Sequence, residues 1–197
     1  MLTSLTSLMK IELVFISKIV FKISVNFNIQ EHTIDLVSGD LLLIKGNNGQ
    51  GKTTWLKRLS VADQRMDLSF NDSKIKSWDH NWLMSQAVLW HENGWLDALS
   101  VSGNMKQYGL IYDEAFSQKP MGALSAGQKQ MLALKRVMMS NRPVWILDEP
   151  LSYLDKTKQC WFMDVIKLHG QIGGIVIVSS HHDLDIIESG RQQVVRL

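Results

Sequence analysis

The chain has 197 residues, which is enough for one domain with a sizeable core and too short for two such domains in tandem. Its formal net charge is only +2 and no block of like charge occurs, so an acidic tail and a basic arm for nucleic acid are both excluded. Cys160 is the single cysteine, which excludes an internal disulfide and a cysteine-rich metal site; we expect it half-buried on a helix, in a reducing compartment.

The apolar N-terminal stretch Ile11–Phe27 raises the question of a membrane span or a signal sequence. Charged residues such as Lys18 and Lys22 interrupt it, so no run approaches the ~18 to 20 apolar residues that crossing a bilayer needs. A mitochondrial transit peptide is disfavoured because Glu12 and Glu31 intrude and arginine is absent there. The alternation of apolar and polar residues predicts β-strand instead. Any work at a membrane therefore requires another chain to supply the span.

The first half of the chain is predicted to be mostly strand. Residues 11–45 have the pattern of antiparallel strands, with a turn at 38–40 before a buried strand at 41–45. Residues 53–59 are predicted to form a helix. The polar segment 66–79 is irregular, with at most one short strand pair.

The middle of the chain is helical and aromatic. From Trp82 to Met121 we find no strand-like run after Leu89, and Trp90 and Trp95 lie close to Trp82 in the sequence. These tryptophans are suited either to a partner surface or to core packing, because aromatic side chains dominate both. Ser125 is expected to begin a helix with one apolar stripe, formed by Met131, Leu134, Val137 and Met138.

The last third alternates between strand and helix. Continuous apolar runs at 144–147 and 175–178 predict buried strands, separated by a helix at 156–169, and residues 192–196 are expected to form the final strand. Buried apolar strands that alternate with helices are typical of a parallel sheet covered on both faces. The sequence therefore predicts an α/β fold.

A glycine-rich segment follows the buried strand at 41–45 and fits the phosphate-binding loop pattern G-x-x-x-x-G-K-S/T. Glycines let successive backbone N–H groups face phosphate oxygens, and the next helix adds its positive end. In this pattern Lys52 would neutralise the β- and γ-phosphates and Thr53 would ligate Mg²⁺. A plain glycine-rich turn is the alternative, which the preceding strand and following helix disfavour. The candidate binding residues are Gly46, Asn47, Asn48, Gly49, Gln50, Gly51, Lys52, Thr53 and Thr54.

Three further segments follow this loop in a fixed order: Leu124–Gln128 (LSAGQ), Val144–Pro150 (VWILDEP) and His181 after an apolar run. With the loop, they resemble the ATP-binding cassette (ABC) ATPases over residues from roughly 41 to 186. The resemblance implies one P-loop NTPase domain over residues 1–197, using ATP and Mg²⁺. It also implies a mostly parallel core sheet, an N-terminal antiparallel part, and a small helical subdomain at approximately 82–140.

The strand that ends in Asp148 places a carboxylate at the carboxyl edge of the sheet, where open α/β sheets bind ligands and where it can hold Mg²⁺ through water. The resemblance implies that Glu149 is the catalytic base that orients or deprotonates the attacking water. A structural alternative is that both residues only cap a strand, but Pro150 and the following residues 152–155 complete the family pattern. His181 matches the switch histidine that contacts the γ-phosphate; His182 beside it is the less favoured choice.

Ser125 and Gly127 match the family's signature, and the resemblance implies that this helix start faces the nucleotide of a second copy. ATP would then hold two copies together. Ala126 departs from the commoner glycine and is expected to be tolerated. Tyr153 departs from the usual small residue in the loop between subunits, which leaves that contact open.

The largest departure is at His91, where most ABC ATPases have a glutamine that touches Mg²⁺ and the membrane partner. A histidine there is similar to what the haem-exporter ATP-binding subunits of cytochrome c maturation show, and it makes His91 a candidate metal contact. The aromatic residue that stacks on adenine stays open among Phe15, Phe21 and Phe27.

The short chain, the segment 144–150 and the apolar run 173–178 before the histidine also resemble the haem-exporter subunits. This implies a peripheral ATPase, in two copies, docked through the region 95–108 on an integral membrane subunit. Its place would be the cytoplasmic face of the inner membrane, or the matrix face if mitochondrial. The alternatives are an ATPase subunit of another ABC transporter, or a soluble ABC ATPase of iron–sulfur assembly or scaffold type. Lys52 and Glu149 disfavour a scaffold without hydrolysis, and the absence of long heptads disfavours a DNA clamp.

Overall fold

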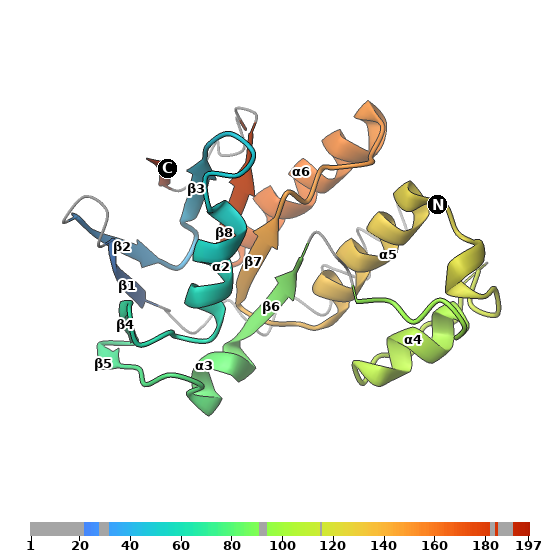
Figure 1. Cartoon of the computed structure of the whole chain (residues 1–197), viewed down its shortest axis with the longest axis horizontal. Coiled ribbons are helices and arrows are strands. Elements are labelled where there is room, and N and C mark those ends of the chain that lie inside the picture. Colours follow the sequence, from blue (N-terminus) through green and yellow to red (C-terminus); the bar gives the residue numbers. More distant parts are fainter. Residues whose placement is uncertain (1–21, 28–31, 91–93, 115, 182–183, 185–190) are drawn as a thin grey trace.

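Two β-sheets organise the part of the chain that the structure describes (Figure 1). The structure is a computed structural model that describes residues 22–27, 32–90, 94–114, 116–181, 184 and 191–197. Of the sequence predictions, those on residues 11–21, on His91 and on His182 lie outside the described residues.

The larger sheet has five strands, and every neighbouring pair is parallel. Its strands are, in spatial order, β6 (Gln86–Leu89), β7 (Val144–Asp148), β8 (Ile175–Ser180), β3 (Leu41–Lys45) and β9 (Gln192–Arg196). All residues of β7 and β8 are buried, which explains their continuous apolar sequences. The predicted parallel core sheet is therefore confirmed.

Helices cover both faces of this sheet. On one face α5 (Ala126–Met139) and α6 (Lys156–Gln171) pack against side chains such as Trp145 and Val176. On the other face, α2 (Lys52–Ser60) packs against side chains such as Ile146 and Ile177. The apolar stripe predicted on α5 is present, with Leu134, Val137 and Met138 buried in the first of these two clusters and Met131 packed against it.

The smaller sheet is antiparallel and lies on the side of α2. Its spatial order is β2 (His32–Val37), β1 (Lys22–Phe27), β4 (Asp67–Phe70) and β5 (Ser73–Lys74). The prediction of antiparallel strands before the loop is confirmed for β1 and β2. It is wrong for β3, which pairs in parallel with β8 and β9, because fully apolar strands are buried on both faces of the main sheet.

Shorter helices lie between β5 and β7 along the chain: α3 (His80–Ser85), α4 (Val101–Gln107) and the 3-10 helix η2 (Met121–Ala123). The residues around α4 and η2 form a small apolar cluster of their own that includes Val101, Met105 and Leu132 of α5. Figure 1 shows α4 and the first turns of α5 set apart from the antiparallel sheet. This is the small helical subdomain expected for the fold.

Two open points of the sequence are resolved by burial. The indole of Trp82 is fully buried and donates to the carbonyl of Leu59 at 3.0 Å, so it belongs to the core. Trp90 and Trp95 are only partly buried. The expectation that Cys160 is half-buried is wrong, because its side chain is exposed on the face of α6 opposite to Phe162 and Ile166, which enter the core.

Candidate functional site

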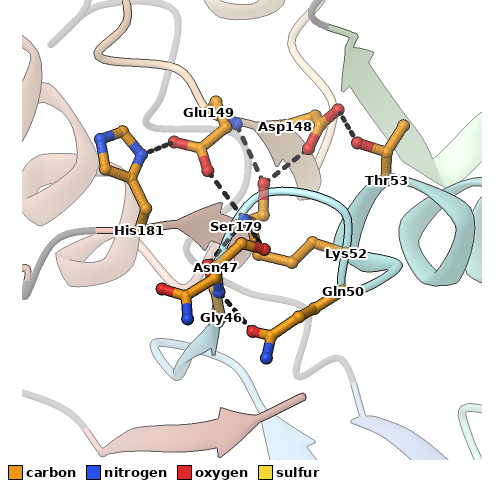
Figure 2. Close-up of polar contacts among 9 residues, drawn as sticks. All are labelled: Gly46, Asn47, Gln50, Lys52, Thr53, Asp148, Glu149, Ser179 and His181. Carbon is orange, nitrogen blue, oxygen red and sulfur yellow. Dashed lines mark hydrogen bonds and ion pairs between the residues drawn. The ribbon is translucent and has the colours of Figure 1, made fainter.

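The carboxyl ends of β3, β7 and β8 converge on one edge of the parallel sheet, where open α/β sheets place their ligand sites. The loop that follows β3 leads directly into α2, Asp148 ends β7, and His181 follows β8. Figure 2 shows the side chains of these three segments turned toward one another.

The loop before α2 is shaped by glycines. Gly49 and Gly51 have φ of 85° and 92°, in the left-handed region where a side chain would be strained. A Cβ on Gly46 would lie 2.7 Å from the Gln50 side-chain oxygen, which accepts a hydrogen bond from the Asn47 backbone N–H and closes the loop. No side chain caps the start of α2, so its first N–H groups are not occupied by a capping group. Such a helix start suits an anion.

Lys52 is the buried cation of this loop, with 6% of its surface exposed. Its Nζ donates to the carbonyl oxygens of Gly46 at 2.7 Å and Asn47 at 3.2 Å. It also lies 3.3 Å from Oε1 of Glu149. Backbone N–H groups and one ammonium thus line the same loop, which is an arrangement that binds phosphate.

Asp148 is almost fully buried and accepts two hydrogen bonds from hydroxyl groups. Its Oδ2 accepts from Thr53 Oγ1 at 2.7 Å, and its Oδ1 accepts from Ser179 Oγ at 2.6 Å. Ser179 Oγ in turn accepts from the backbone N–H of Glu149 at 3.0 Å. Ser179 was missed in the sequence, although it lies directly across from Asp148 in the register of β7 and β8.

The carboxylate and hydroxyl oxygens of Asp148 and Thr53 are the type of ligand that Mg²⁺ prefers. Among the described residues, no group of three or more His, Cys, Asp and Glu side chains is placed to hold a metal ion. His91 lies outside the described residues, so its predicted metal contact stays a prediction.

Glu149 lies between a cation and an imidazole. Its Oε2 is 2.9 Å from Nδ1 of His181, and its Oε1 faces the Lys52 ammonium. Its backbone is left-handed, with φ of 47°, a conformation that is uncommon for non-glycine residues. The structure thus brings the predicted catalytic pair, Glu149 and His181, within hydrogen-bond distance of each other (Figure 2).

These side chains line a cavity of about 640 Å³, within the size range of small-molecule and cofactor sites. Most of the loop from Asn48 to Thr54 faces this cavity, opposite Asp148, Glu149 and His181. Lys57 and Trp90 also line it, and the Lys57 ammonium lies 6.0 Å from the centre of the Trp90 ring. Sequence reasoning missed both, since neither belongs to a motif. The remaining loop residues Gly46, Asn47 and Gln50 line a smaller hollow of about 240 Å³ beside it.

Ser125 and Gly127 do not line this cavity. Ser125 is exposed and caps α5: its Oγ accepts from the Gln128 N–H at 3.2 Å, while its own N–H donates to the Gln128 side chain at 2.9 Å. Gly127 instead touches its own chain, because a Cβ there would lie 2.8 Å from the carbonyl oxygen of Tyr153. The structure therefore separates these two predicted nucleotide contacts from the other predicted site residues.

The adenine-stacking residue stays open, because Phe15, Phe21 and the side chain of Phe27 lie outside the described residues.

Within the described segments, no helix has both the length and the apolar character needed to cross a bilayer.

Residues 29–152 match the family model described as ABC transporter. The chain is 33% identical over 182 residues to the cytochrome c biogenesis ATP-binding export protein CcmA of Aliivibrio fischeri, which covers 81% of this chain and 86% of that protein. It is 32% identical over 173 residues to CcmA 2 of Cupriavidus metallidurans, with 77% and 81% covered.

Solved structures show the same fold. A putative ABC transporter ATP-binding protein from Pyrococcus furiosus superposes with a TM-score of 0.69 at 21% sequence identity, covering 88% of this chain and 97% of that one.

Proposed function

This chain belongs to the ABC transporter family of ATP-binding proteins, and we propose that it hydrolyses ATP for an export complex used in the biogenesis of c-type cytochromes, with haem as cargo. The ATPase part is supported above all by one observation: Lys52, Asp148 and Glu149 meet at the carboxyl edge of the sheet. The choice of export complex is supported by the likeness to the CcmA proteins. Since the chain has one cysteine and no C-x-x-C-H motif, haem would be handled by a partner.

ATP phosphates would lie against the loop before α2. The backbone N–H groups of the loop and of the first turn of α2 would donate to phosphate oxygens, and Lys52 would exchange its two carbonyl contacts for the β- and γ-phosphates. The oxygen atoms of Thr53 and Asp148 would hold Mg²⁺, which when bound neutralises the charge that develops on the transferred phosphoryl group.

Glu149 would orient or deprotonate the attacking water. Its Oε2 accepts a hydrogen bond from His181 when Nδ1 of the imidazole carries the proton, which fixes the direction of the carboxylate. Groups that are already in position need little reorganisation during the reaction. His181 would also contact the γ-phosphate from the end of β8.

The complete site would need a second copy of the chain. Ser125 and Gly127 lie outside the cavity that the other site residues line, so they are available to the nucleotide bound by another copy. In this arrangement ATP joins two copies and its hydrolysis lets them separate. Tyr153, which is 61% exposed beside Gly127, would lie near this junction.

We further propose that the whole chain forms one ATP-binding domain, with the segment at about 82–140 as its helical subdomain. Through residues 95–108 of this segment it would bind an integral membrane subunit at the cytoplasmic face of the inner membrane, or at the matrix face if mitochondrial. The exposed apolar residues Leu96 and Leu99 of this segment support a contact there, since exposed apolar groups mark interaction surfaces when they gather.

The experiment uses a tagged Glu149→Gln variant expressed in native membranes, purified gently in Mg-ATP, with co-purifying chains identified by mass spectrometry. We expect haem-handling integral membrane proteins. Recovery of a solute permease, or of soluble proteins alone, would contradict the haem-exporter proposal. The Lys52→Ala, Glu149→Gln double variant is the control, because it should not retain nucleotide and should lose partners that depend on the ATP-bound state.

A further inference from the structure

The turn that follows β7, residues 149–155, is bound to the start of α5 at two points. Gln130 of α5 is buried, with 3% of its surface exposed, and its side-chain N–H donates to the carbonyl oxygen of Pro150 at 2.8 Å. The second point is the close approach of Gly127 to the carbonyl of Tyr153. In both contacts α5 meets a backbone carbonyl of the turn that begins with Glu149.

The same turn is supported from α6 and from β8. The Gln159 side chain donates to the carbonyl oxygens of Leu154 at 3.0 Å and Leu151 at 3.4 Å. The N–H of Glu149 donates to Ser179. Glu149 is therefore held on its N-terminal side by β8 and on its C-terminal side by Gln130, through Pro150. This explains how a left-handed backbone conformation is maintained at a non-glycine residue.

A small movement of α5 would change the direction of the Glu149 carboxylate. Gln130 is one turn away from the first residues of α5, on a continuous helix, so the helix start and the Gln130 amide move together. The ring of Pro150 fixes its own φ, so a displacement of Pro150 is passed along the backbone to Glu149, to which it is covalently bonded. A misplacement of about 1 Å at a reacting group is enough to lower a rate strongly.

We propose that Gln130 is a positioning residue for Glu149, through which the start of α5 and the carboxylate of the same chain move as one unit. The inference rests on the proposed function: the start of α5 would contact the nucleotide of the second copy, while Glu149 acts on the nucleotide of its own chain. Gln130 would then make hydrolysis in one half-site depend on the closure of the other. Gln130 does not line the cavity in which the nucleotide would bind.

The test is a Gln130→Met variant, which keeps the volume of the side chain and removes its N–H donor. We measure steady-state ATP hydrolysis of the full chain, alone and with the membrane subunits that co-purify with it. Loss of one neutral hydrogen bond predicts that kcat falls on the order of tenfold, while KM and the equilibrium affinity for ATP change by less than about twofold.

Gln86→Met is the matched control. Gln86 is also a buried glutamine that donates to backbone carbonyls, those of Ser60 at 2.6 Å and Trp82 at 3.3 Å, but it lies far along the chain from the turn. It should lose comparable thermal stability and retain its kcat. If Gln130→Met does not fold, Gln130→Asn replaces it, because the shortened amide cannot reach the Pro150 carbonyl.

The outcomes separate the two proposals. If the wild-type chain hydrolyses no ATP, alone or with its partners, both the proposed function and this inference are contradicted. A wild-type chain that hydrolyses ATP, together with a Gln130 variant of unchanged kcat, overturns only the role of Gln130. The same holds if Gln86→Met loses as much kcat as Gln130→Met, since the effect would then be a general loss of packing.

Discussion

Two helix starts in this molecule are built in opposite ways. At the start of α2 the cap is Gly51, no side chain accepts from the first turn, and the residues line the cavity of about 640 Å³. At the start of α5 a full capping box is present, formed by Ser125 and Gln128, and the residues are exposed. The first start has no capping side chain and suits an anion held by its own chain. The second is capped by its own side chains, and in the proposed arrangement it would contact the nucleotide held by another copy.

The largest expected effect comes from a substitution at the start of α2. Lys52→Ala removes the ammonium that the loop encloses, and charge-assisted hydrogen bonds are worth ~1.5 to 3 kcal/mol, so ATP affinity should fall on the order of ten- to a hundredfold. Titration with a fluorescent ATP analogue measures this. Lys74→Ala is the control: Lys74 is exposed on β5 and does not line the cavity, so the ATP affinity of this variant should change little. Equal affinity of Lys52→Ala and wild type would refute the phosphate-loop assignment.

A smaller effect is expected at the second start. Ser125→Ala should leave the ATP affinity of the single chain unchanged, because Ser125 does not line the cavity. In a Glu149→Gln background it should weaken ATP-dependent association of two copies on the order of tenfold. The control is Ser100→Ala. Ser100 caps α4, since its Oγ accepts a hydrogen bond from the N–H of Gly103 at 3.1 Å, so this variant loses a cap without losing a nucleotide contact. Both variants should lose ~1 kcal/mol of stability, and only Ser125→Ala should weaken association.

The smallest effect on nucleotide handling is expected at the opposite edge of the sheet. His169 is fully buried and stacks on Trp145 with ring centres 3.7 Å apart, and burial lowers its pKa to about 3. Below pH ~6.5 the histidine is protonated in the unfolded chain but stays neutral in the folded chain. The free energy of unfolding is therefore highest above pH ~6.5 and falls as the pH drops toward 3.

At pH 5 this lost stability amounts to roughly 2 kcal/mol. His169→Phe keeps the ring stack and should flatten the fall in melting temperature between pH ~6.5 and 4 while ATP affinity at pH 7.5 stays unchanged. Melting curves of the two proteins with the same pH dependence would contradict this account of His169.

The sequence predicted the parts of the site that stand at the ends of apolar strands. Lys52, Asp148 and His181 each follow such a strand or the loop after it, so their meeting at one edge follows from a parallel sheet. Ser179 and Gln130 were missed because their roles depend on register and on helix packing. Ser179 lies opposite Asp148 on the neighbouring strand, and Gln130 reaches a backbone carbonyl twenty residues away. Such contacts leave no local pattern.

The fold was predicted with the same limits. Strand and helix positions follow from periodicity, as β9 at Gln192–Arg196 shows. The pairing of β3 with β8 and β9 does not, because the order of strands in a sheet is set by tertiary packing. The exposure of Cys160 could not be predicted either. The apolar stripe of α6 is weak, and a shift of one residue in its position would move the cysteine to another face of the helix.

The central claim is that the site at α2 is finished by the α5 start of a second copy, and light scattering of Glu149→Gln tests it most directly. The variant replaces the proposed catalytic carboxylate with an amide that can still form hydrogen bonds. ATP should therefore bind and remain unhydrolysed. We predict a monomer without nucleotide, a dimer in saturating Mg-ATP, and a monomer in both conditions for the Lys52→Ala, Glu149→Gln double variant. A Glu149→Gln protein that binds Mg-ATP to saturation and stays monomeric would contradict the composite site.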